Sequence, residues 1–292
     1  MKCKICEVES RTYARAKVLG KYDATVQCCG SCGFVFLDPV TWLVEAYADA
    51  IKPSDVGYVY RNLHAASFVE RFLLNSHRPG DFYCDYGAGY GMFVRLMRDK
   101  GFRFHWHDPF CENLFASYCD AVPEYFGPYR IVTAIEVFEH LHDPVNDLAS
   151  ITELGSTILF TTELIPEPEP SVKDWWYFGL EHGQHISFYS HRSLEVLAER
   201  FDLNYLQLQS NWHLFGSESD ISMAKAFLAP PRRFWRAKFR NRLDPPPSLI
   251  PDDHDVIVRV VNGSIKIGAS EPNNVDWIAA QMRLATKPDL AS

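Results

Sequence analysis

The sequence has no apolar run long enough to cross a membrane. Its longest apolar runs, such as residues 131–135, are far shorter than the roughly 20 residues that span a bilayer. The first ten residues, MKCKICEVES, carry charge with no apolar stretch behind them, so we expect no secretory signal. A reducing cytoplasm is then the expected location, and the cysteines are expected to be thiols or metal ligands.

The chain also lacks an excess of basic residues. It contains 29 Lys and Arg against 37 Asp and Glu, a net charge of −8, so we expect no nucleic-acid partner and only local contacts with polyanions. The 292 residues predict about two domains, and a composition of 47% hydrophobic and 23% charged residues indicates a globular protein. There is no long internal repeat, no Walker phosphate loop, and no spacing of histidine and carboxylate that indicates a catalytic metal.

Cysteines are concentrated at the beginning of the chain, where five of the eight fall within the first 32 residues. Two Cys-x-x-Cys pairs, separated by 22 residues and followed by Gly33, form a zinc-ribbon pattern. The four predicted ligands are Cys3, Cys6, Cys29 and Cys32. Cys28 is an alternative to Cys29, and a set of small buried thiols is the alternative to a metal site. Because four sulfur ligands leave no open position, we interpret the zinc as structural.

A glycine-rich segment, DFYCDYGAGYGMF, begins at Asp81, after a helix that we expect over residues 58–77. Residues 82–86 have the pattern of a strand, and Phe93, Leu96 and Met97 have the spacing of a helix face. Strand, glycine turn and helix in this order predict a nucleotide-binding loop.

The glycine spacing and a downstream acid indicate which cofactor binds. Gly87, Gly89 and Gly91 give GxGxG, whereas the dinucleotide pattern GxGxxG needs glycine where Met92 stands. Seventeen residues after Gly91, the strand-like run FRFHWH ends in Asp108, the position of an acid that binds ribose hydroxyls in Rossmann-like folds. The alternative for Asp108 is an aspartate in a surface loop.

The same alternation of strand and helix continues along the chain. We expect a strand over residues 130–137, a helix that begins at Asp143 and Pro144 and ends at Gly155, and a strand over residues 157–162. This order predicts an α/β fold with a mainly parallel sheet, which binds ligands at the carboxyl ends of its strands. Three residues are expected at that edge: Gly87, Asp108 and Glu136.

These segments together resemble the class I S-adenosylmethionine-dependent methyltransferases. DYGAGYG matches the first motif of that family, HDPF its acidic ribose contact, and IEVFEHLHDP its fourth-strand motif. CGSCGFVFLDP and GQHISFYSHRSLEVLAERF are similar to a bacterial branch that has an N-terminal zinc ribbon and includes sugar C-methyltransferases. The resemblance covers residues 1–215 and implies a Rossmann-like seven-stranded sheet, with a reversed final hairpin of residues 205–209 and 212–215.

The resemblance also implies roles and boundaries. Asp108 would hold the ribose of S-adenosylmethionine, and Glu136 would lie close to the cofactor. The methionine end would be held by Asp85, Gly87, Gly89 and Gly91. Glu139 and His140 would orient a loop or take part in catalysis. The implied domains are a ribbon over residues 1–40, a methyltransferase domain over 41–220 with a lid at 163–190, and a C-terminal appendix over 221–292.

The lid segment holds the candidate for catalysis. His185 follows four consecutive aromatic residues, 175–178, of which we expect at least half to pack in the core while the rest offer a platform for a sugar. An imidazole can accept the acceptor's proton near neutral pH, so His185 is the predicted general base. The alternative is a histidine that only hydrogen-bonds the loop, and His182, Glu181 and Tyr177 are weaker candidates.

The C-terminal appendix has a basic start. Six Arg or Lys lie between Arg232 and Arg242 among aromatic residues. This composition indicates either weak contact with a membrane surface or polyanion, or a helix packed on the enzyme. Beyond it, VIVRVV and SIKIG suggest a hairpin around Asn262 and Gly263, followed by a helix at DWIAAQMRLA.

Three functions compete at this stage. The first is a methyltransferase that uses S-adenosylmethionine and a small-molecule acceptor, either a sugar or nucleotide-linked sugar or another metabolite. The second is a zinc-ribbon binding protein whose methyltransferase-like domain is inactive. The third is a nicotinamide-dependent oxidoreductase, which Met92 disfavours.

Overall fold

The computed structural model describes residues 1–48, 55–167, 170–229 and 245–285. The chain divides into two compact units. The first unit comprises Met1–Tyr58 and Val132–Arg232, and the second comprises Val59–Ile131 and Arg233–Ser292. Within the described residues, no helix has the length and apolar character needed to cross a membrane.

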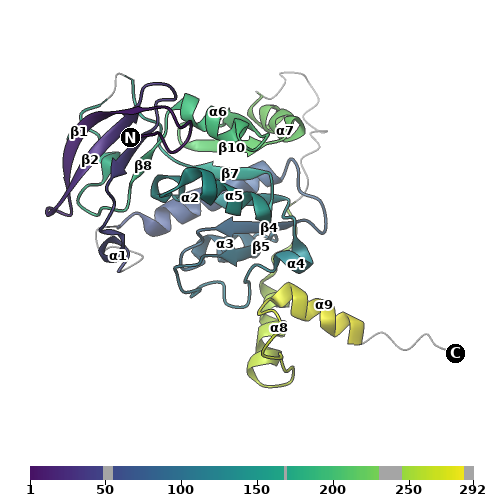
Figure 1. The fold of residues 1–292 in the computed structure, drawn as a ribbon. Coiled ribbons are helices and arrows are strands. Elements are labelled where there is room, and N and C mark those ends of the chain that lie inside the picture. Colours follow the sequence, from purple (N-terminus) through teal and green to yellow (C-terminus); the bar gives the residue numbers. More distant parts are fainter. Residues whose placement is uncertain (49–54, 168–169, 230–244, 286–292) are drawn as a thin grey trace. The chain divides into compact units, whose positions relative to one another are not determined.

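The first unit begins with a small antiparallel sheet (Figure 1). Its strands lie in the order β1 (Ser10–Val18), β2 (Tyr22–Cys29), β3 (Val35–Asp38) and β8 (Ser187–Phe188). β1 and β2 are joined by a tight turn in which Leu19 and Gly20 both have positive φ angles, of 51° and 70°. Because β8 lies near the end of the lid segment, this sheet joins the beginning of the chain to the lid.

The core under this sheet contains side chains from the beginning of the chain and from the lid segment. Val26, Leu37 and Trp42 pack with Tyr177 and Phe178, and all are buried. Trp42 lies just before the short helix α1 (Leu43–Ala46), and its indole Nε1 donates to the Gly183 carbonyl at 2.7 Å. The prediction that at least half of the aromatic run packs in the core is confirmed, whereas Trp176 is 74% exposed.

The first unit also holds the later strands of the α/β fold. They lie in the order β6 (Ile131–Ala134), β7 (Ile158–Thr161), β10 (Trp212–Gly216) and β9 (Asn204–Gln207). β6 and β7 are parallel, while β10 is antiparallel to both β7 and β9. The reversed final hairpin is therefore confirmed.

Three helices of this unit begin at polar caps. Asp143 accepts from the Asn146 N–H at the start of α5 (Pro144–Leu154), and the cap at its end is Gly155, as expected. The helices α6 (His191–Glu199) and α7 (Glu218–Leu228) begin at capping boxes formed by Ser190 and Ser217. Two short 3-10 turns are η1 (Phe138–His140) and η2 (Trp176–Phe178).

The second unit contains the glycine-rich segment. Its elements in chain order are α2 (Tyr58–Leu73), β4 (Phe82–Tyr86), α3 (Met92–Asp99), β5 (Arg103–His107) and α4 (Pro123–Phe126). β4 and β5 are parallel, which confirms the predicted strand, turn, helix and strand.

The strand number differs from the seven that the resemblance implies. Among the described residues, six strands belong to the α/β fold: β4, β5, β6, β7, β9 and β10. Beyond β5, Asp120 pairs with Trp106 by a single parallel bridge and forms no strand.

The expectation of a hairpin around Asn262 and Gly263 is wrong. Those residues end the helix α8 (Ile250–Val261), and a second helix, α9 (Val275–Ala285), follows as predicted. Proline and acidic residues in the first turn of α8 favour a helix, and Gly263, with φ of 76°, lies one residue beyond its C-cap. The asparagine–glycine pair therefore ends a helix here.

A buried ionic cluster fixes α8 and α9 within the second unit. The Arg98 guanidinium, 1% exposed, donates to both Asp253 oxygens at 2.8 and 2.6 Å and to Asp276 at 2.8 Å. Burial alone would raise the pKa of Asp276, but the charge of Arg98 and a hydrogen bond from His105 outweigh it and hold that pKa well below its usual value. The basic stretch at 232–242 lies outside the described residues.

Candidate functional site

The glycine loop lies between β4 and α3. Gly87, Gly89 and Gly91 have φ angles of 67°, 53° and 85°, in the left-handed region that favours glycine. The N–H groups of Gly87 and Ala88 both donate to the His107 carbonyl, at 2.9 and 3.3 Å, so the loop is tied to the end of β5.

Two glycines of this loop have different surroundings. A Cβ at Gly91 would lie 2.8 Å from the Asn113 Oδ1 and 3.1 Å from the Ala116 Cβ, so the following loop packs directly on it. A Cβ at Gly89 would meet no atom within 4 Å, so this part of the loop faces open space. The Cα of Gly89 thus leaves space beside the loop.

The structure brings Asp108 to this loop. One carboxylate oxygen accepts from the Gly89 N–H at 2.8 Å, and the other accepts from the N–H groups of Phe110 and Cys111 at 2.8 and 3.0 Å. The Trp106 indole donates to the Gly89 carbonyl at 2.7 Å. Asp85, 3% exposed, lies opposite Trp106 in the register of β4 and β5. The acid after β5 therefore contacts the glycine loop directly, and its role in binding a ribose stays a prediction.

Glu136 lies after β6, in the first unit. It has a φ angle of 56°, which is unusual for a residue with a side chain. The Thr161 hydroxyl accepts from the Glu136 N–H at 2.8 Å and donates to its carboxylate at 2.9 Å. These two bonds fix the side chain against β7.

Three other residues of the first unit form a cluster. The ligand atoms of Glu139, His140 and His185 all lie within 4.8 Å of one another. In the sequence, His185 and the Glu139–His140 pair are separate candidates, with no spacing of histidine and carboxylate that indicates a metal site. No local spacing could reveal it, because the two parts are brought together by folding: the Ile186 N–H donates to the Glu139 carbonyl at 2.8 Å.

The electrostatics of this cluster are set by burial. Burial lowers the pKa of His140 to about 4. Burial also raises the pKa of Glu139, the Glu136 carboxylate raises it further, and the Tyr177 hydroxyl opposes both effects. Neither oxygen of Glu139 has a partner at hydrogen-bond geometry.

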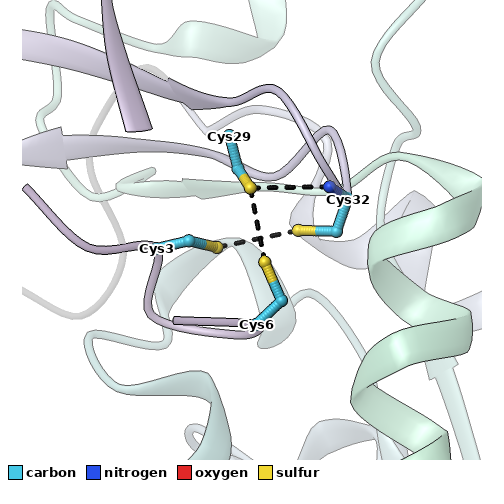
Figure 2. A group of neighbouring side chains, drawn as sticks. All are labelled: Cys3, Cys6, Cys29 and Cys32. Atoms are coloured by element: carbon cyan, nitrogen blue, oxygen red, sulfur yellow. Dashed lines mark hydrogen bonds between the residues drawn. The ribbon is translucent and has the colours of Figure 1, made fainter. Parts of the chain in front are cut away.

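The four predicted zinc ligands also lie together (Figure 2). The Sγ atoms of Cys3 and Cys32 are 3.6 Å apart, and those of Cys6 and Cys29 are 3.4 Å apart. A tetrahedral zinc with Zn–S bonds of about 2.3 Å places its sulfurs roughly 3.8 Å apart, so this donor set fits the ion. The hydrogen bond between Cys3 and Cys32 lowers the pKa of Cys3 to about 5 and raises the pKa of Cys32, so these two sulfurs share one proton. Cys28, the alternative ligand, is not part of this group.

Helix α6 contacts both turns of this cysteine cluster. At its first turn, the Ser190 hydroxyl donates to the Cys32 carbonyl at 2.6 Å. At its other end, the Arg200 guanidinium donates to the Ile5 carbonyl at 2.7 Å. A Cβ at Gly33 would lie 2.8 Å from the Ser190 hydroxyl oxygen, so this close approach requires glycine.

Comparison with solved structures finds several methyltransferases. A methyltransferase of calicheamicin biosynthesis, in its SAH-bound form, is 15% identical with a TM-score of 0.35; the match covers 59% of this chain and 60% of that one. Magnesium protoporphyrin IX methyltransferase from Synechocystis PCC 6803, with bound SAH, is 13% identical with a TM-score of 0.40, over 61% and 96% of the two chains. 1,6-Didemethyltoxoflavin-N1-methyltransferase from Burkholderia thailandensis, with bound 1,6-didemethyltoxoflavin and S-adenosylhomocysteine, is 13% identical with a TM-score of 0.40, over 71% and 97% of the two chains.

The chain thus spans about three fifths of the length of the first of these structures. No curated protein matches the sequence. A family model described as a methyltransferase domain matches residues 59–208, which is more than half of the chain and includes the glycine loop, Asp108 and His185. The chain therefore belongs to the methyltransferase-domain family.

Proposed function

We propose that the protein transfers a methyl group from S-adenosylmethionine to a small-molecule acceptor. The observation that carries this proposal is the bond of the Asp108 carboxylate to the Gly89 N–H, within a glycine loop that has free space beside Gly89. It lies in the segment that matches the methyltransferase-domain family.

The residues suit the parts of this cofactor. We assign the ribose hydroxyls to the Asp108 carboxylate, which can accept their hydrogen bonds. We assign the methionine end to the segment Asp85, Gly87, Gly89 and Gly91, because glycines allow close approach of the backbone. Glu136 is proposed to lie near the cofactor, where a carboxylate favours a cation. When bound, the cofactor supplies an electrophilic methyl group on a positively charged sulfur.

His185 is the residue that we propose accepts the acceptor's proton. Its Nδ1 lies 2.6 Å from the Tyr177 carbonyl, so Nδ1 carries the hydrogen and Nε2 is the basic nitrogen. General-base assistance of this kind contributes roughly 10²- to 10⁴-fold in rate.

The acceptor is proposed to be a sugar, a nucleotide-linked sugar or another small metabolite. The exposed indole of Trp176, in the lid, offers an apolar face of the kind on which sugar rings pack. The four cysteines are proposed to hold a structural zinc ion.

The second candidate, a zinc-ribbon binding protein with an inactive methyltransferase-like domain, makes a different prediction. We would titrate the full-length protein with S-adenosylhomocysteine and with NAD by isothermal calorimetry. The proposed function expects saturable binding of S-adenosylhomocysteine and none of NAD. Failure to bind either ligand would support the inactive binding protein, and binding of NAD alone would indicate an oxidoreductase.

A further inference from the structure

We propose that Glu139, His140 and His185 form a binding site for one divalent cation of the first transition-metal row, in addition to the cysteine cluster. The site would be built from η1 and the end of the lid, both in the first unit.

Both imidazoles are held by a hydrogen bond of the same ring nitrogen, Nδ1. His140 Nδ1 lies 2.9 Å from the Gln184 carbonyl, and His185 Nδ1 lies 2.6 Å from the Tyr177 carbonyl. A carbonyl can only accept, so each Nδ1 carries the hydrogen and each Nε2 keeps its lone pair. Histidine ligands of metal ions are commonly oriented by such a bond from the other ring nitrogen to a backbone carbonyl.

The carboxylate of Glu139 supplies the third ligand. The side chain is 0% exposed, and neither of its oxygens has a partner at hydrogen-bond geometry, although the Tyr177 hydroxyl is near enough to lower its pKa. A buried carboxylate without a partner is costly in free energy, and a cation held by the same oxygens would remove that cost. The carboxyl groups of Glu136 and Glu163 are near enough to raise the pKa of Glu139, and their charge also favours a cation.

The ligand chemistry selects the class of ion. Two imidazole nitrogens and one carboxylate oxygen suit Mn²⁺, Fe²⁺, Co²⁺ or Zn²⁺, whereas Mg²⁺ and Ca²⁺ prefer oxygen ligands alone. Three protein ligands leave at least one coordination position open. The cluster therefore differs from the cysteine site, in which all four positions are filled by sulfur.

The cation would also control His185. The Nε2 of one imidazole cannot bind a cation and accept a proton at the same time. Metal content would therefore decide whether His185 acts as a proton acceptor, a consequence that rests on the proposed function. Cation binding itself does not depend on it.

The test is a titration of full-length, zinc-replete protein with Mn²⁺. The electron paramagnetic resonance signal of free Mn²⁺ measures how much of the ion remains unbound. Zinc-replete cysteines do not take up Mn²⁺, because thiolates favour softer ions. Before the titration, a mild chelator removes any ions that are bound more weakly than the zinc of the four cysteines. We expect the wild type to bind about one Mn²⁺ per chain, and Zn²⁺ to displace it.

Glu139→Gln is the informative variant. It keeps the shape of the side chain and resembles the protonated acid that burial favours, so it should fold, and its melting curve would verify this. We expect it to bind Mn²⁺ at least tenfold more weakly. The matched control is His142→Ala, which removes an exposed histidine two residues from His140 and should bind as the wild type does.

Two results would overturn the proposal: no saturable Mn²⁺ binding by the wild type, or unchanged affinity in a folded Glu139→Gln. Calorimetry with S-adenosylhomocysteine on the same samples separates the two proposals. If Mn²⁺ binds and S-adenosylhomocysteine does not, only the proposed function fails.

Discussion

Replacement of Asp108 by Ala tests the site on which the proposed function depends. The carboxylate accepts three backbone N–H groups, from Gly89, Phe110 and Cys111, and is proposed to accept the ribose hydroxyls as well. A donor left without its acceptor costs about 1–3 kcal/mol. If the ribose loses this partner, the dissociation constant for S-adenosylhomocysteine should rise roughly 5- to 150-fold.

Isothermal calorimetry with S-adenosylhomocysteine measures this effect, and a thermal melt shows whether the variant is folded. Glu112→Ala is the matched control, because it removes an exposed acid of the same loop and changes the net charge equally. Its affinity should stay within twofold of the wild type. An Asp108→Ala protein that is folded and binds with unchanged affinity would refute the assignment of Asp108 to the ribose.

Three further predictions concern other parts of the molecule. Metal analysis should find about one zinc per chain held by sulfur, and Cys6→Ser should lose it; a folded, zinc-free wild type would contradict the ribbon. His185→Ala should slow turnover by roughly 10²- to 10⁴-fold with unchanged affinity for S-adenosylhomocysteine. Normal turnover in this variant would show that His185 only hydrogen-bonds the loop and does not accept the proton. Arg98→Met should lower the free energy of unfolding by about 3–5 kcal/mol at neutral pH, because Asp253 and Asp276 lose their buried counter-charge. The pKa of Asp276 is lower in the folded protein than in the unfolded chain, so its ion pair stabilises the fold above a pH of about 4. This stabilisation is lost as the pH falls through the folded-state pKa. In urea unfolding, the difference in stability between the wild type and Arg98→Met should therefore become smaller in acid.

Features fixed by local chemistry could be predicted from the sequence. The strand before the glycines and the helix after them follow from hydrophobic spacing. The ends of α5 follow from the Asp143 cap and Gly155. The cysteine cluster follows from two short spacings, each of which forms one tight turn.

Features that depend on distant contacts could not be predicted in this way. Valine-rich residues of α8 resemble a strand, but the bond of Asp253 to Arg98 holds this segment as a helix on α3. The meeting of Glu139 with His185 depends on how the lid returns to η1. Sequence spacing carries no information about such a return.

The bonds of helix α6 to the two cysteine turns make the N-terminal segment an integral part of the first unit. Ser190 contacts the second cysteine turn, Arg200 contacts the first, and lid residues Tyr177 and Phe178 share a core with the ribbon strands. Release of the metal would therefore loosen the lid and both ends of α6 together. If the four cysteines hold zinc as proposed, their oxidation or chelation would then disturb the segment that carries His185.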